Sequence, residues 1–81
     1  MQTRKSSQAF YEIKVEGDLG DLWSNSFEGL KMRREISNEN GEPVTVLFGL
    51  IPDQPALHGV ITRIRDLNLI LISVQKVTKK G

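Results

Sequence analysis

The sequence predicts an α+β domain with the ferredoxin-like strand and helix order βαββαβ: a four-stranded antiparallel sheet with two helices on one face. Residues of the first three predicted strands alternate with a period of two, and the last strand is rich in β-branched residues; both features are typical of strands. One longer segment instead repeats its apolar residues at helical spacing, and a shorter segment begins with helix-capping residues. Because crossover connections are right-handed, this order favours one sheet with both helices on the same side.

The first strand is predicted over residues 9–16, where Tyr11, Ile13 and Val15 share the inward side. Residues 18–29 then begin with aspartate and space their apolar residues three to five apart. This spacing suits a short or irregular helix, although its serine and asparagine residues are poor helix formers.

The second and third strands are predicted as an antiparallel hairpin over residues 30–36 and 44–48. The turn between them contains Asn40-Gly41, a pair that readily adopts the positive φ of tight hairpins. The third strand is expected to point three apolar side chains at the core: Val44, Val46 and Phe48. Leu47 then points outward.

The long helix is the element with the clearest boundaries. Asp53 is a good N-cap, Pro55 falls in the first turn, and Asn68 can adopt the left-handed conformation that ends a helix. The apolar residues between them repeat at helical spacing: Leu57, Val60, Ile61, Ile64 and Leu67. This stripe predicts a helix that packs one face against the sheet.

The final strand is predicted over residues 70–77, with Leu71 and Val77 on its outward side. Together with Leu47, these side chains would form one apolar patch on the open face of the sheet. Three basic side chains surround the patch in this arrangement: Lys14, Lys31 and Arg33. Exposed apolar patches often mark contacts with partners, so we predict that this face binds a protein partner or a second copy of the chain.

Charged side chains share the outward sides of the first two strands: Glu12, Lys14, Glu16, Lys31, Arg33 and Glu35. If the two strands belong to one sheet, these charges form a lattice of mixed sign. Cross-strand pairs of this kind contribute a few tenths of a kcal/mol each and suit a solvated surface. A pair of catalytic carboxylates would need a cleft, which the pattern does not predict.

The charge distribution argues against nucleic-acid binding across the folded face. The chain has 11 basic and 10 acidic residues. Residues 1–8 and 76–81 hold five of the bases and no acid, so residues 9–75 carry 6 − 10 = −4. We expect one domain over residues 9–77, a disordered tail over residues 1–8 and a basic tail over residues 78–81. Weak, salt-sensitive nucleic-acid binding through these basic ends is the alternative function.

Several classes of function lack the residues that they require. With no cysteine and one histidine, the chain has no disulfide, cysteine nucleophile or multi-histidine metal site. Its glycines form neither a dinucleotide fingerprint nor a P-loop. His58 has no evident carboxylate partner, and with Phe48 turned inward the open face offers no aromatic platform for RNA. We therefore predict no catalytic centre, no cofactor and no metal; an enzyme that uses His58 is the least favoured class.

The location expected from the sequence is the cytoplasm. No apolar run approaches the roughly 18 residues that a membrane span needs. The N-terminal residues lack the apolar stretch of a signal peptide, and the absence of cysteine is compatible with a reducing compartment.

Three motifs in the second half of the chain carry a resemblance: DQPALHG at 53–59, RIRDLNL at 63–69 and LISV at 71–74. They resemble a group of short bacterial proteins of uncharacterised function, in which the same region reads DQxALHG, RIRDLGL and LLSV. The likeness extends weakly to the first strand and to four residues that follow it: Trp23, Phe27, Gly29 and Leu30. It implies a bacterial origin and no particular activity. Asn68 stands where these relatives often have glycine.

Overall fold

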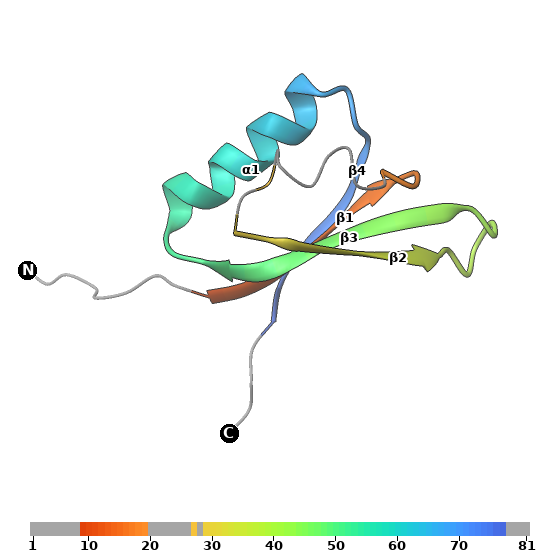
Figure 1. Cartoon of the computed structure of the whole chain (residues 1–81), viewed down its shortest axis with the longest axis horizontal. Coiled ribbons are helices and arrows are strands. Elements are labelled where there is room, and N and C mark those ends of the chain that lie inside the picture. Colours follow the sequence, from red (N-terminus) through yellow and green to blue (C-terminus); the bar gives the residue numbers. More distant parts are fainter. Residues whose placement is uncertain (1–8, 20–26, 28, 78–81) are drawn as a thin grey trace, which may run out of the picture.

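The computed structural model describes residues 9–19, 27 and 29–77, and it has an α+β architecture (Figure 1). The elements follow the chain in this order: β1 (Ala9–Glu16), β2 (Lys31–Ile36), β3 (Pro43–Ile51), α1 (Gln54–Asp66) and β4 (Leu71–Val77). The strands form one sheet in the order β2-β3-β1-β4, and every neighbouring pair is antiparallel. The predicted helix over 18–29 lies largely outside the described residues, as do both predicted tails.

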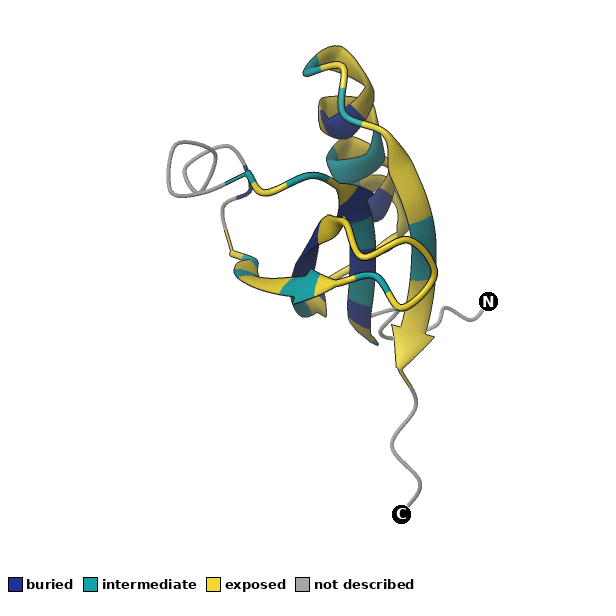
Figure 2. Cartoon of the chain, turned by 90° about the vertical axis from the view of Figure 1, so that its right-hand side faces the viewer, coloured by how far each residue is buried: buried dark blue, intermediate teal, exposed yellow. Residues whose placement is uncertain are grey.

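The core lies between α1 and one face of the sheet. Tyr11, Ile13 and Val15 point toward this core from β1, as their alternation predicted. Leu57 and Ile64, one part of the apolar stripe of α1, meet them from the helix. Figure 2 shows this buried layer where the sheet faces the helix, whereas β4 is mostly exposed at the side of the molecule.

The side assignment predicted for β3 is wrong by one residue. Leu47 pairs with Ile13, is 0% exposed and belongs to the core, so it cannot form part of an outward patch. Val44, Val46 and Phe48 were predicted to point at the core, but they lie on the side of the sheet that faces away from α1. Gly49 comes two residues after Leu47 and therefore lies on the same, inward side of the sheet. A Cβ added to Gly49 would lie 3.1 Å from the Gly29 carbonyl oxygen. The backbone at Gly29 therefore lies close to β3 on the inward side of the sheet.

The outward placement predicted for Leu71 is also wrong, because a β-bulge interrupts β4. Ser73 pairs with Lys14, but the next pair along β1 joins Val15 to Leu71, which leaves Ile72 as the extra residue. Leu71 therefore lies opposite an inward-pointing side chain, although it stays exposed at the sheet edge. A bulge inserts one extra residue into the strand, so the alternation of inward and outward side chains shifts by one residue from one side of the bulge to the other.

The boundaries predicted for the long helix are confirmed. The Asp53 side chain accepts a hydrogen bond from the Ala56 N–H at 2.9 Å. At the other end Asn68 has a φ of 62°, and the Leu69 N–H donates to the Ile64 carbonyl at 3.0 Å. Both ends of α1 thus satisfy backbone groups that a helix leaves without partners.

The chain that leaves β1 is held against β3 by Thr45. Its buried hydroxyl donates to the Gly17 carbonyl at 2.7 Å and accepts from the Leu19 N–H at 3.1 Å. Nearby, Asp18 forms an ion pair with Arg34 at 2.7 Å. These contacts fix the end of β1 beside β2 and β3. No helix in the described ranges is long and apolar enough to cross a membrane.

Candidate binding surface on the open sheet face

The open face is the side of the sheet that points away from α1 (Figure 1). Strand alternation and register place one set of side chains on it: Phe10, Glu12, Lys14 and Glu16 from β1, Lys31, Arg33 and Glu35 from β2, Val44, Val46, Phe48 and Leu50 from β3, and Ser73, Gln75 and Val77 from β4. Three regions follow one another along the strands: an apolar end, a charged centre and an acidic end.

The charged centre is a network of ion pairs across three strands. The Arg33 guanidinium lies 2.9 Å from a Glu35 carboxylate oxygen and 3.6 Å from one of Glu12. Lys14 Nζ lies 3.8 Å from the other Glu35 oxygen. This confirms the predicted lattice of mixed sign. Since these side chains are partly exposed, each pair contributes little to stability by charge alone.

The network also covers an apolar residue. Val46 points to the open side, yet it is 0% exposed. Lys14 and Arg33 are its direct neighbours on β1 and β2. Long basic side chains commonly lay their aliphatic stems over apolar surface while keeping the charge in water. The charged centre is therefore a packed layer as well as an electrostatic one.

Two aromatic rings lie next to this network. The centroids of Phe10 and Phe48 are 6.3 Å apart, and the Arg33 guanidinium carbon stands 5.1 Å from the centroid of the Phe48 ring. These distances suit an aromatic pair and a cation–π contact. Arg33 therefore covers one aromatic ring, and Phe10 is the more exposed of the pair.

The apolar end of the face is a row of side chains in register across three strands. Phe10 pairs with Leu50 on one side and with Val77 on the other. These residues are 37%, 57% and 42% exposed, respectively. We call this set, Leu50–Phe10–Val77, the apolar row. It is a continuous apolar surface that the described residues leave open to solvent.

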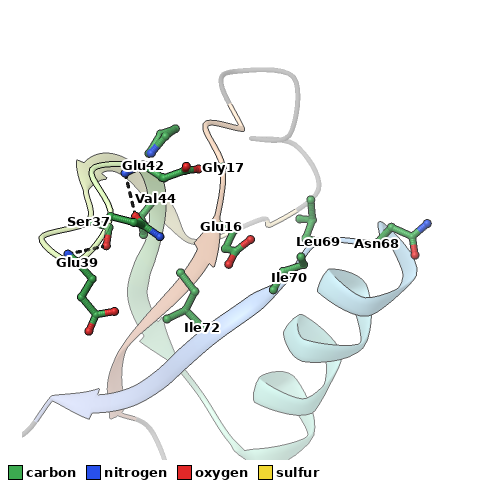
Figure 3. A pocket seen from close by; sticks show the side chains of 12 residues that line it. Glu16, Gly17, Ser37, Glu39, Glu42, Val44, Asn68, Leu69, Ile70 and Ile72 are labelled. Carbon is green, nitrogen blue, oxygen red and sulfur yellow. Dashed lines mark hydrogen bonds between the residues drawn. The ribbon is translucent and has the colours of Figure 1, made fainter.

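At the other end of the strands lies an open groove of about 440 Å³ (Figure 3). Its walls come from the β2–β3 hairpin, the end of β1, the segment between α1 and β4, and the start of β4, and they include Val44, Ile70 and Ile72. Within the hairpin, the Glu39 N–H donates to Ser37 Oγ and the Glu42 N–H donates to Asn40 Oδ1; Figure 3 marks both bonds. The hairpin backbone is thereby braced where it borders the groove.

The groove is acidic. Among the described residues that line it, the ionisable side chains are Glu16, Glu39 and Glu42. All three residues are exposed. Exposed carboxylates of this kind differ from the buried, apolar setting that turns a carboxyl group into a general acid. The groove therefore adds negative charge to one end of the face.

The residues predicted for the interaction patch have separate positions. Lys14, Arg33, Lys31 and Val77 lie on the open side, as predicted. The structure does not bring together the predicted apolar trio that includes Leu47. The sequence interpretation missed Phe10, Phe48 and Leu50 as a common surface. Because β3 has apolar residues on both of its sides, the sequence alone does not determine which side faces the core. The small Gly49 opposite the bulky Tyr11 is the feature that could have indicated the inward side.

Outside the open face, two observations on the described residues bear on a reactive site. His58 is exposed on α1. No group of three or more histidine, cysteine, aspartate or glutamate side chains suited to a metal ion occurs within the described ranges.

Comparison with known proteins places the chain in a family. Residues 10–75 match the model described as "Domain of unknown function (DUF8691)". The match covers most of the chain, from β1 into β4, so the protein belongs to this family. No curated protein and no solved structure showed significant similarity to it.

Proposed function

We propose that the protein is a small, non-catalytic protein-binding module whose contact surface is the apolar end of the open sheet face. The observation that carries this proposal is the apolar row, in which three large exposed side chains lie in register across adjacent strands. Complete burial of an exposed phenylalanine side chain contributes about 1.5–3 kcal/mol, and Phe10, which is 37% exposed, would gain part of this on association. A surface of this kind is small, and it suits a regulatory or adaptor contact.

The charges of the face favour a protein partner over a nucleic acid. In the charged centre, Arg33 and Lys14 are matched by Glu12 and Glu35, so little positive charge is left for phosphates. Arg33 also covers the ring of Phe48, which leaves less aromatic surface for stacking bases. Apolar contacts with a polar rim are typical of protein interfaces.

The ferredoxin-like arrangement belongs to the same proposal. The sheet order β2-β3-β1-β4 supports it, since this fold places β1 between β3 and β4. We extend the proposal to a cytoplasmic protein of bacterial origin, on the basis of the missing cysteines and of the motifs in the second half of the chain.

Phe10→Glu tests the contact surface. Wild-type protein and the variant are immobilised and incubated with a bacterial lysate, and the bound proteins are quantified. We expect wild type to retain a specific protein and Phe10→Glu to retain at least about tenfold less, since the variant loses the apolar contact and also brings an unpaired carboxylate into the interface. Leu50→Glu should reproduce the loss.

The matched control is Ile36→Glu. Ile36 is 60% exposed and pairs with Pro43 on the helix side of the sheet, so this variant makes the same kind of change away from the open face. It should retain the protein as wild type does. Equal retention by all variants, or no retention above a blank support, would contradict the proposal.

One observation favours the alternative, nucleic-acid binding through the basic ends. Phe10 pairs with Val77, so the chain enters β1 and leaves β4 at the same end of the sheet. The basic residues of 1–8 and 78–81 therefore join the domain beside the apolar row. Retention of nucleic acid in the same experiment, weakened by salt and abolished by removing both segments, would favour this alternative.

A further inference from the structure

β4 is the outermost strand of the sheet, next to β1. No strand in the described part of the chain pairs with its outer edge. An edge strand presents a row of backbone N–H and C=O groups that can pair with another chain, and proteins commonly protect such edges with charge or irregularity. The two edges of this sheet differ in how far they are protected.

The hydrogen bonds show which β4 groups point outward. The Glu16 N–H donates to the Ile70 carbonyl at 2.9 Å, and the Gly17 N–H donates to Pro43 on the other side. Because the backbone N–H and C=O groups of successive residues point to alternate sides of a strand, those of Lys14, Glu12 and Phe10 also point to β4. Their partners there are Ser73, Gln75 and Val77. The residues between these partners, Val74 and Lys76, therefore direct their backbone groups to the outer edge.

The side chains of the two edge strands differ in charge. β2 carries four charged residues among six: Lys31, Arg33, Arg34 and Glu35. β4 has one among seven, Lys76. Of the exposed large apolar residues, four lie in or next to β4: Ile70, Leu71, Ile72 and Val77. The bulge at Ile72 protects only the start of the strand, and Ser73–Val77 remains regular.

We infer that β4 pairs antiparallel with β4 of a second copy of the chain, which joins two sheets into one of eight strands. This goes beyond the proposed function, because the contact is the sheet edge and not the open face. Pairing centred on Gln75 places Val74 of each copy opposite Lys76 of the other. Both residues point their backbone groups outward, so two hydrogen-bonded pairs form around a twofold axis.

Charge selects a second β4 as the strand that fits this edge. In the pairing centred on Gln75, each Lys76 faces a valine, and no like charges are directly opposed. Pairing with β2 of another copy would instead bring the strand that holds Lys76 against a strand with three basic residues and one acidic residue, and it would leave a free edge on each copy. That arrangement is both repulsive and open-ended, whereas β4 with β4 closes after two copies.

The test is the oligomeric state of purified protein by sedimentation velocity, from micromolar to millimolar concentration. We expect wild type to form a dimer. Lys76→Pro removes an outward-pointing N–H without removing a hydrogen bond to β1, and it should raise the dissociation constant at least about tenfold, since two bonds are lost per dimer. Lys76→Ala keeps the N–H and should remain dimeric.

The matched backbone control is Ile36→Pro. By the same alternation, Ile36 points its N–H away from β3 at the other edge, so this variant should also remain dimeric. A monomeric wild type at millimolar concentration, or a Lys76→Pro variant that dimerises like wild type, would overturn the inference. Either result leaves the proposed open-face contact untouched, because that contact is tested with Phe10→Glu.

Amide hydrogen exchange provides a second readout that needs no variant. In the dimer, the amides of Val74 and Lys76 should be protected, and dilution to the monomer should remove this protection. The amides of Ser73 and Gln75, which bond to β1, should change much less. Exchange at Val74 and Lys76 that does not depend on protein concentration would contradict pairing at this edge.

Discussion

At the scale of single residues, Arg33 connects the regions of the open face. Its guanidinium reaches Glu12, Glu35 and the Phe48 ring, and its stem lies across the strand from Val46. The ion pairs are partly exposed and so contribute little to stability by charge. Shielding apolar surface from water is the larger contribution, because Val46 is buried although it points away from the core.

Arg33→Ala should therefore destabilise the fold mainly by uncovering apolar surface. We expect a loss of about 1 kcal/mol in the free energy of unfolding, measured with urea, since part of Val46 and Phe48 becomes accessible. Because the loss is not chiefly electrostatic, it should persist in high salt. Arg65→Ala, at an exposed position of α1 away from this face, is the control and should change stability by less than about 0.5 kcal/mol. A loss that disappears in salt would contradict this explanation.

At the scale of elements, the position of β3 depends on Gly49. This residue has a φ of 153°, and an added Cβ would lie 3.1 Å from both the Gly29 carbonyl oxygen and the Leu30 side chain. The segment before β2 therefore packs directly against the β3 backbone. Only glycine combines this backbone conformation with so close an approach.

Gly49→Ala should lower the free energy of unfolding by about 1–3 kcal/mol, from backbone strain and the close contact together. Gly59→Ala is the matched control. Gly59 lies on α1 with no atom within 4 Å of an added Cβ, so alanine there should stabilise the helix by about 0.5–1 kcal/mol. Thermal unfolding of both variants measures the contrast. A Gly49→Ala protein as stable as wild type would show that the approach is easily relaxed.

The same elements show what the sequence could predict. The limits of α1 depend on local chemistry: Asp53 caps the first turn and Asn68 ends the last, and both roles are evident from residue type. The side of β3 depends on tertiary packing, because large apolar residues occur at both parities and a one-residue error reverses Leu47 and Phe48. The sequence therefore placed Val77 and the three basic residues on the side of the sheet where they lie, and it misplaced Leu47 and Leu71.

The β4 bulge was beyond prediction for a related reason. Residues 70–72 are all large and apolar, so no period of two marks the position where the alternation shifts. The displacement follows from pairing with β1, where Val15 and Lys14 face Leu71 and Ser73. Only the partner strand determines which residue of β4 is extra.

At the scale of the whole molecule, a small domain gains much from association. A chain of this size buries a modest fraction of its surface on folding, and its stability margin is correspondingly thin. Pairing at β4 would satisfy edge backbone groups and cover apolar side chains that the described monomer leaves exposed. Association at the edge leaves the apolar rows of both copies open, so a dimer would offer two equivalent surfaces to a partner.

If folding and pairing at β4 are coupled, the unfolding temperature must depend on protein concentration. A ligand that binds only the folded state stabilises it by mass action, and here the ligand is the chain itself. Each tenfold rise in concentration above the dissociation constant adds about 0.7 kcal/mol per chain, half of the 1.4 kcal/mol for a factor of ten. For a domain of this size, that raises the midpoint by about 3–5 °C. At concentrations between the dissociation constants of wild type and Lys76→Pro, scanning calorimetry should show this rise for wild type and Phe10→Glu, and a constant midpoint for Lys76→Pro. A concentration-dependent midpoint in Lys76→Pro as well would place the stabilising contact elsewhere on the molecule, because that variant leaves the open face and β2 unchanged.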